Sequence, residues 1–226
     1  MGYLLLEGGA EFGGRMRDPD LKAIELAGGF EAPIRIIPTA AAPDNNHKRA
    51  GNNGIRWFQS LGARAVGSVP LIDKASANDE NLTMSLREAK LIYMLGGFTG
   101  YLGETLKGSL AWQAVLEAYA TGAVVAGSSA GAMVMCELYY DPGRGQVIEG
   151  LNLVPNSLVL PHHNTFGKNW APRLLKISQV TLVGIDEGTG MLDDGAGKWT
   201  VYGAGDVTLY RNKKVEIYEA GKAFSV

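Results

Sequence analysis

Short, continuous apolar runs alternate with helix-like segments along most of this chain, and this alternation limits the fold more than any other feature of the sequence. Uninterrupted runs of Val, Ile and Leu are typical of strands buried on both faces, as in a parallel sheet covered by helices. The sequence therefore predicts an α/β fold with a three-layer, mostly parallel sheet and helices on both faces. Strands are predicted at Tyr3–Glu7, Ile34–Pro38, Ala65–Leu71, Leu91–Leu95, Ala123–Ala126 and Val180–Ile185, and helices at Leu21–Ala27, Arg56–Leu61, Asn81–Ala89 and Leu110–Tyr119.

The pattern changes after Trp199, where apolar and polar residues alternate around turn residues. Three short runs, Trp199–Tyr202, Val207–Arg211 and Val215–Glu219, follow one another with a turn at Asn212-Lys213. Alternation of this kind favours a C-terminal antiparallel meander. The chain has 226 residues, of which 46% are hydrophobic, and contains no linker-like segment. We therefore expect a single domain spanning residues 1–226.

Composition excludes several classes of protein. The net charge of -2 offers no basic field for a nucleic-acid backbone. Cys136 is the one cysteine, so neither an intrachain disulfide framework nor a cysteine-based zinc site is expected. The chain begins without the basic region of a signal peptide, and no run approaches the roughly 20 apolar residues of a membrane helix. We expect a cytoplasmic protein that binds neither nucleic acid nor membrane.

A possible nucleophile lies on the turn Gly127-Ser128-Ser129-Ala130-Gly131. The pattern G-x-S-x-G is common by chance, but here it follows a buried strand and precedes the apolar run Ala132–Met135, as a nucleophile elbow requires. Small residues allow the sharp turn, and the helix N-terminus favours developing negative charge. Ser129 is therefore the predicted nucleophile. A Gly/Ser-rich turn without chemistry is the alternative.

A catalytic serine needs a base, and the chain has three histidines. His47 falls in the polar loop Asp44–Arg49, where a solvated residue is the simpler interpretation. His162 and His163 follow the strand-like run Ser157–Leu160 and Pro161. Either could reach the edge of the sheet as general base, or both could be structural.

The orienting acid should accept a hydrogen bond from the far ring nitrogen of that histidine. Glu137 is our preferred candidate because a continuous helix from Ser129 would bring it two turns along, on roughly the same side. It would also give the chain order nucleophile, acid, base that is found in α/β-hydrolases. Asp141 and Glu149 also lie between the serine and the histidines, and each of these three carboxylates could instead be a surface or capping group. Asp186 and Glu187 are further candidates, because they stand at the end of a buried strand, where sites in such sheets gather.

The oxyanion hole should use the N–H of Ala130, the residue after the nucleophile, and a second N–H from a neighbouring loop. Gly97 is the candidate for the second donor, because Gly96-Gly97 ends the predicted strand Leu91–Leu95. A plain turn is the alternative interpretation.

Taken together, these residues resemble the S51 serine peptidases, the group containing peptidase E and cyanophycinase. The run Gly127–Ala132 is similar to the G-[TS]-S-A-G-A motif of that family. Further similar segments occur in the same order: Leu6–Ala10, Ile34–Ala40, Leu95–Gly97, Pro161-His162 and Gly184–Glu187. The resemblance runs from near residue 4 to near residue 192.

The resemblance implies a fold like that of class I glutamine amidotransferases, with serine in place of cysteine, and no cofactor or metal. It also implies that His162 is the catalytic histidine and that the Gly-Gly turn contributes to the oxyanion hole. Phe98-Thr99 stands where the family often has Asn-Gln or Asn-Thr. The Arg-x-Arg cluster that often follows the histidine in cyanophycinases is missing.

These departures leave the preference for aspartyl substrates open. Phe98, Thr99 and His163 are candidate substrate-binding residues, with Lys168 and Arg173 as candidates for a substrate carboxylate. We expect a serine peptidase that hydrolyses short peptides, as a dipeptidase or a cyanophycinase-like enzyme, through Ser129, His162 and Glu137. The alternatives are an esterase or amidase with the same elbow, or a non-catalytic binding module of the same fold. The sequence does not define which substrate side chain is preferred, and a homodimer is possible.

Overall fold

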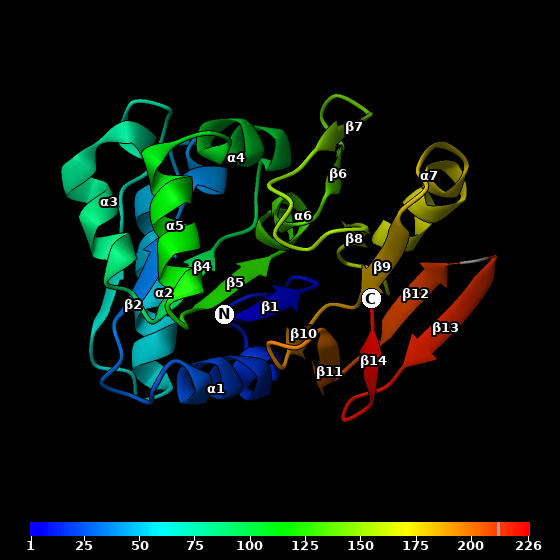
Figure 1. The fold of residues 1–226 in the computed structure, drawn as a ribbon, viewed down its shortest axis with the longest axis horizontal. Helices are drawn as coiled ribbons and strands as arrows, with labels where there is room; N and C mark the ends of the chain where they lie inside the picture. Colours follow the sequence, from blue (N-terminus) through cyan, green and yellow to red (C-terminus); the bar gives the residue numbers. More distant parts are fainter. Residues whose placement is uncertain (212) are drawn as a thin grey trace.

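A twisted eight-stranded sheet forms the centre of the protein in the computed structural model, which describes residues 1–211 and 213–226 (Figure 1). Its strand order is β14-β11-β10-β1-β5-β4-β2-β3. The five strands from β1 to β3 in this order are parallel, and β10, β11 and β14 extend the sheet in antiparallel fashion. The strands are β1 (Tyr3–Glu7), β2 (Ile34–Ile37), β3 (Val66–Ser68), β4 (Leu91–Met94), β5 (Val124–Ser128), β10 (Thr189–Asp193), β11 (Lys198–Gly203) and β14 (Ala223–Ser225).

Helices cover both faces of this sheet. Successive side chains of β1 point to opposite faces and pack against different sets of helices. Leu4 and Leu6 belong to one core cluster, with residues of α3 to α6, whereas Leu5 belongs to a second, with residues of α1 and α2. The predicted three-layer arrangement is therefore confirmed. The helices are α1 (Arg17–Leu26), α2 (His47–Ser60), α3 (Glu80–Arg87), α4 (Thr99–Leu106), α5 (Leu110–Ala120), α6 (Ala130–Met135) and α7 (Ala171–Ile177), with short 3-10 turns at Gly14–Met16, Thr39–Ala41, Ser76–Asn78 and Gly167–Trp170.

A second sheet, with order β13-β12-β9-β8, packs beside the first. In it β8 and β9 are parallel, and the remaining pairs are antiparallel. Its strands are β8 (Ser157–Leu160), β9 (Thr181–Ile185), β12 (Val207–Arg211) and β13 (Lys214–Tyr218), and a separate hairpin joins β6 (Leu138–Asp141) to β7 (Gln146–Glu149).

The C-terminal strands are antiparallel as expected, but they do not form one meander. β11 pairs with β10 and β14 in the large sheet, whereas β12 and β13 continue the second sheet from β9. Asn212, in the predicted hairpin turn, lies outside the described residues. His47 is also not in a loop, because α2 begins with it.

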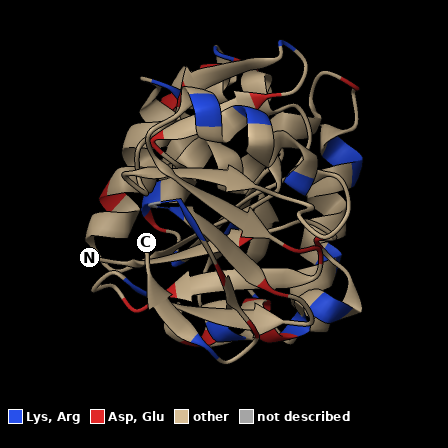
Figure 2. Cartoon of the chain, turned by 90° about the vertical axis from the view of Figure 1, so that its right-hand side faces the viewer, with Lys and Arg blue, Asp and Glu red and all other residues tan. Residues whose placement is uncertain are grey.

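Charged residues of both signs are interspersed on the side of the molecule seen in Figure 2. Within the described ranges, none of the helices has the length and apolar character needed to cross a bilayer.

Candidate active site

Ser129 occupies the sharp turn between β5 and α6. Its backbone has φ 48° and ψ -109°, a conformation that L-residues rarely adopt and that is typical of strained functional turns. The Ser129 N–H donates to the carbonyl of Glu7 at 3.0 Å, so β1 holds the turn in place. The strand, turn and helix predicted around the nucleophile are thus present.

His162 follows β8 and also has a left-handed backbone, with φ 50°. Its N–H donates to the carbonyl of Gly8 at 2.7 Å, and its ring lies against Gly9. A Cβ on Gly9 would be 2.3 Å from His162 Cε1, so only glycine leaves room for the imidazole there. On its other side the ring stacks on Phe166, with centroids 4.8 Å apart. These contacts fix the imidazole beside Ser129.

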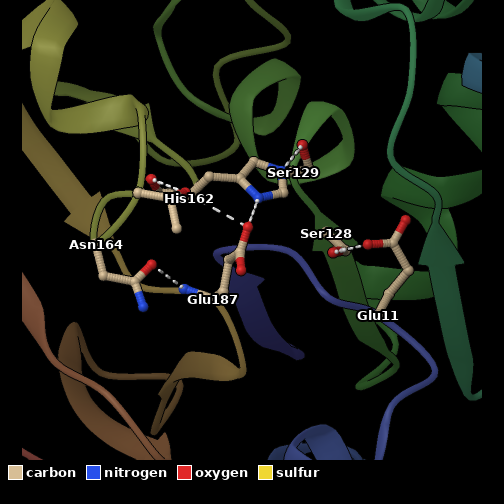
Figure 3. A network of polar contacts seen from close by, with 7 residues as sticks. Glu11, Ser128, Ser129, His162, Asn164 and Glu187 are labelled. Carbon is tan, nitrogen blue, oxygen red and sulfur yellow. Dashed lines mark hydrogen bonds and ion pairs between the residues drawn. The ribbon is translucent and has the colours of Figure 1, made fainter.

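Two hydrogen bonds join Ser129, His162 and Glu187 in a line (Figure 3). His162 Nε2 lies 3.1 Å from Ser129 Oγ, and His162 Nδ1 lies 2.8 Å from Glu187 Oε1. Because a carboxylate accepts only, Nδ1 donates to it, which leaves Nε2 to accept from the serine hydroxyl. Asn164 Oδ1 accepts from the Glu187 N–H at 3.0 Å, and this hydrogen bond fixes the backbone that carries the acid.

The three side chains come from the carboxyl ends of parallel strands in two different sheets. Ser129 follows β5 of the large sheet, whereas His162 and Glu187 follow the neighbouring strands β8 and β9. The Gly8–Gly9 segment links the two sheets, since the Gly9 carbonyl also accepts from the Gly188 N–H at 3.1 Å. Sites of open α/β sheets gather at this edge.

Glu137, expected to orient the histidine, is not near it. The premise of one continuous helix is wrong, because α6 ends at Met135 and Cys136 is extended. Glu137 Oε2 instead accepts from the Asn156 N–H at 2.8 Å. The expected chain order is replaced by serine, histidine, glutamate, with the acid last.

The other carboxylates have partners elsewhere. Asp141 Oδ1 accepts from the Gly143 N–H at 2.9 Å, and Glu149 Oε2 accepts from Lys107 Nζ at 3.1 Å. Asp186 Oδ1 lies 3.4 Å from His163 Nδ1. Only Glu187 of the acids weighed from the sequence contacts the His162 ring, within the part of the chain that the structure describes.

The two expected oxyanion donors are Ala130, which follows Ser129 in the chain, and Gly97, whose neighbour Gly96 lies close to Ser129. Ala130 opens α6, so its N–H has no partner within that helix. The Gly96-Gly97 turn touches the nucleophile, because a Cβ on Gly96 would be 3.2 Å from Ser129 Cβ. The N–H of Gly97 donates no hydrogen bond to any residue in the described ranges.

Cavities open beside this turn, and Phe98 lines two of them. The larger, of about 650 Å³, is also lined by Glu11, Trp57 and Gly97; the other is about 480 Å³. The Phe98 side chain is 46% exposed. Thr99, in contrast, is buried, with its hydroxyl facing the sulfur of Met133 at 3.8 Å, so it offers little to a substrate.

Of the remaining substrate-binding candidates, His163 and Arg173 are engaged by other residues and Lys168 is exposed. His163 is buried in the second sheet, where Nε2 lies 2.8 Å from the hydroxyl of Tyr210. Burial is the main cause that lowers the pKa of His163, and this favours a neutral, structural role. Arg173 donates to the carbonyl of Gly145 at 2.8 Å, and Lys168 is exposed on the turn before α7.

Two contacts of the site have no counterpart in the sequence-based analysis. Phe166 stacks on His162, and Glu11 hydrogen-bonds to Ser128 at 3.0 Å. Glu187 was a minor candidate, and its one sequence signal was its position at the end of a buried strand. Among the residues described, no group of three or more His, Cys, Asp or Glu side chains could hold a metal ion.

A serine, a histidine and a carboxylate joined in this way on an α/β fold form the arrangement found in serine hydrolases. Comparison with known proteins defines the group more closely. The profile of peptidase family S51 matches residues 4–197, so the chain belongs to that family.

The chain is similar to named peptidases in sequence and structure. It is 29% identical to a cyanophycinase of Synechococcus elongatus over 92% of this chain and 67% of that protein. The crystal structure of a peptidase from an acI-B1 Actinobacterium superposes with a TM-score of 0.90 at 29% identity, covering 100% of this chain and 97% of the other. A putative peptidase E of Listeria monocytogenes, at 22% identity with a TM-score of 0.63, covers 98% of this chain and 100% of its own and shares the fold.

Proposed function

We propose that the protein hydrolyses short peptides through a catalytic triad of Ser129, His162 and Glu187. The observation that carries this proposal is the line of two hydrogen bonds, 3.1 Å from serine to histidine and 2.8 Å from histidine to glutamate. Both lengths are within the range expected for a nucleophile, its base and the group that orients the base.

In the first half of the reaction, Ser129 Oγ attacks the carbonyl carbon of the scissile peptide bond. Its proton passes to His162 Nε2, while Glu187 stabilises the imidazolium through Nδ1–H. The carbonyl oxygen becomes negatively charged and accepts from the N–H groups of Gly97 and Ala130. The C–N bond then breaks, and the His162 proton goes to the leaving amine, which gives an acyl-enzyme.

Water completes the reaction by the same route. His162 takes a proton from the water as its oxygen attacks the acyl carbon. The new tetrahedral centre collapses, the bond to Ser129 Oγ breaks, and the proton returns from His162 to the serine. The products of this second step are a free carboxylic acid and the regenerated enzyme, and the reaction as written uses no cofactor.

The cavity beside the Gly96-Gly97 turn supports a small substrate. Its volume of about 650 Å³ is in the range of pockets that take small molecules. Phe98 lines it, and we propose that this exposed ring contacts the substrate. The names of the relatives, a cyanophycinase and several peptidases, agree with peptide-bond hydrolysis.

A panel of dipeptides varied at both positions, run beside a panel of p-nitrophenyl esters, tests this function. We expect peptide hydrolysis by the wild type and none by Ser129→Ala, which fits the same tight turn. Hydrolysis of esters alone would contradict the peptidase assignment. Undiminished activity in a folded Ser129→Ala protein would contradict the mechanism.

A further inference from the structure

One carboxylate, that of Glu11, binds to two segments of the proposed active site. Its Oε2 accepts from Ser128 Oγ at 3.0 Å, and its Oε1 accepts from the Gly96 N–H at 3.3 Å. Ser128 directly precedes Ser129, and Gly96 directly precedes Gly97. Figure 3 shows Ser128 pointing toward Glu11, away from His162. Glu11 therefore holds the residue before the nucleophile and the residue before a proposed oxyanion donor.

The packing around the Gly96-Gly97 turn leaves it little freedom. A Cβ on Gly96 would be 2.8 Å from Glu11 Oε1, so carboxylate and turn are in direct contact. On the far side of the turn, the Phe98 N–H donates to the carbonyl of Ala40 at 2.8 Å. The turn is thus held between Glu11 and the segment after β2.

The charge of Glu11 does not explain its position. None of the Lys or Arg side chains in the described ranges pairs with it. Its neighbours Glu7 and Asp20 are acids, whose pKa values are raised mainly by burial and further by the charge of Glu11. A negative charge here also opposes the charge that forms on the substrate oxygen. Glu11 also lines the cavity of about 650 Å³, and its two hydrogen bonds tie it to Ser128 and Gly96.

Building on the proposed function, we propose that Glu11 is a positioning residue that aligns the Gly97 N–H with Ser129 for the acylation step. It acts through the backbone of the turn and touches no reacting atom. A neutral acceptor of the same shape should serve as well, because the role requires hydrogen bonds rather than charge. Glutamine meets this requirement: its carbonyl can accept from Gly96, and its amide N–H can donate to Ser128 Oγ.

The rate at which a fluorophosphonate probe phosphonylates Ser129 measures this alignment. Ser129 Oγ bonds to phosphorus, fluoride leaves, and the phosphonyl oxygen occupies the oxyanion hole. For Glu11→Ala we expect a maximal labelling rate about 10- to 100-fold below wild type. The probe concentration for half-maximal rate should change little, because binding precedes alignment. Glu11→Gln should restore most of the rate. Glu31→Ala, which removes an exposed glutamate paired with Arg64, is the matched control and should label like wild type.

Wild-type labelling of a folded Glu11→Ala protein would overturn the proposal, and so would a Glu11→Gln protein as slow as Glu11→Ala. The second would mean that the charge itself is needed, as for binding a substrate cation. If Glu11→Ala does not fold, Glu11→Asp keeps the charge but withdraws the carboxylate from Gly96 and Ser128, and a wild-type rate for that variant also contradicts alignment. If the probe labels the wild type but not Ser129→Ala, Ser129 remains the proposed nucleophile whatever the Glu11 variants do. An unlabelled wild type contradicts the proposed function and the alignment with it.

Discussion

Replacing Glu187 by Gln tests the one member of the proposed triad that the sequence-based analysis assigned differently. The amide keeps the size of the side chain but removes the negative charge beside the imidazole. Its NH₂ group can also donate to Nδ1, which would leave the proton on Nε2 and stop that nitrogen from accepting from Ser129. Both effects lower the rate of acylation.

The geometry gives the size of the effect. With about 4 Å between charge centres and an effective dielectric constant of about 20, the carboxylate attracts the imidazolium by ~4 kcal/mol. That energy corresponds to roughly a 10³-fold change in rate. Because 36% of the Glu187 side chain is exposed, solvent weakens the attraction. We therefore expect kcat to fall by about 10²- to 10³-fold.

The assay is kcat on the best dipeptide of the panel, with the thermal unfolding midpoint measured beside it. Glu137→Gln is the matched control, since it is the same chemical change at a carboxylate that binds only the Asn156 N–H in the described structure. Its kcat should be close to wild type. A folded Glu187→Gln protein with wild-type kcat, or a Glu137→Gln protein with a severe loss, would refute the assignment.

Further predictions concern the base, its packing and a buried acid. His162→Ala should lower kcat severely, whereas His163→Ala should chiefly lower the unfolding midpoint, and the reverse pattern would move the base to His163. Gly9→Ala should lower kcat by displacing the imidazole, since its Cβ would lie 2.3 Å from His162 Cε1; retained kcat would contradict that steric argument. Burial raises the pKa of Asp20 from 3.8 to about 7, so the folded state holds a proton that the unfolded state releases. The free energy of unfolding should therefore fall as pH rises from about 4 to about 7. Urea titrations of Asp20→Asn should give a flatter dependence on pH. An equally steep dependence in the variant would contradict the contribution of Asp20.

Sequence patterns predicted best those elements whose signal is local. Continuous apolar runs located the parallel strands of the large sheet, with ends shifted by up to a few residues. Helix α4, which contains Gly100 and Gly103, was not predicted, nor was the antiparallel strand β10. Glycine disfavours an isolated helix, and α4 forms because most of its residues are buried against neighbouring elements.

The meander illustrates a different reason for failure. The apolar and polar alternation after Trp199 indicates strands, but it carries no information about which sheet each strand joins. β11 and β12 follow each other in the chain, yet the first pairs with β10 and the second with β9. Pairing of this kind depends on contacts between distant segments.

The sequence by itself determined the elbow at Ser129, because strand, small-residue turn and helix are all encoded within a dozen neighbouring residues. It also brought His162 and Gly97 into consideration, each at the end of an apolar run. Only the tertiary structure decided which acid reaches the histidine: Glu187 lies 25 residues beyond His162, and the parallel pairing of β8 with β9 brings the two together. Glu137 is nearer to Ser129 along the chain, but the extended backbone at Cys136 carries it away. Local geometry follows from short-range sterics, whereas the partners in a site depend on how separate sheets meet.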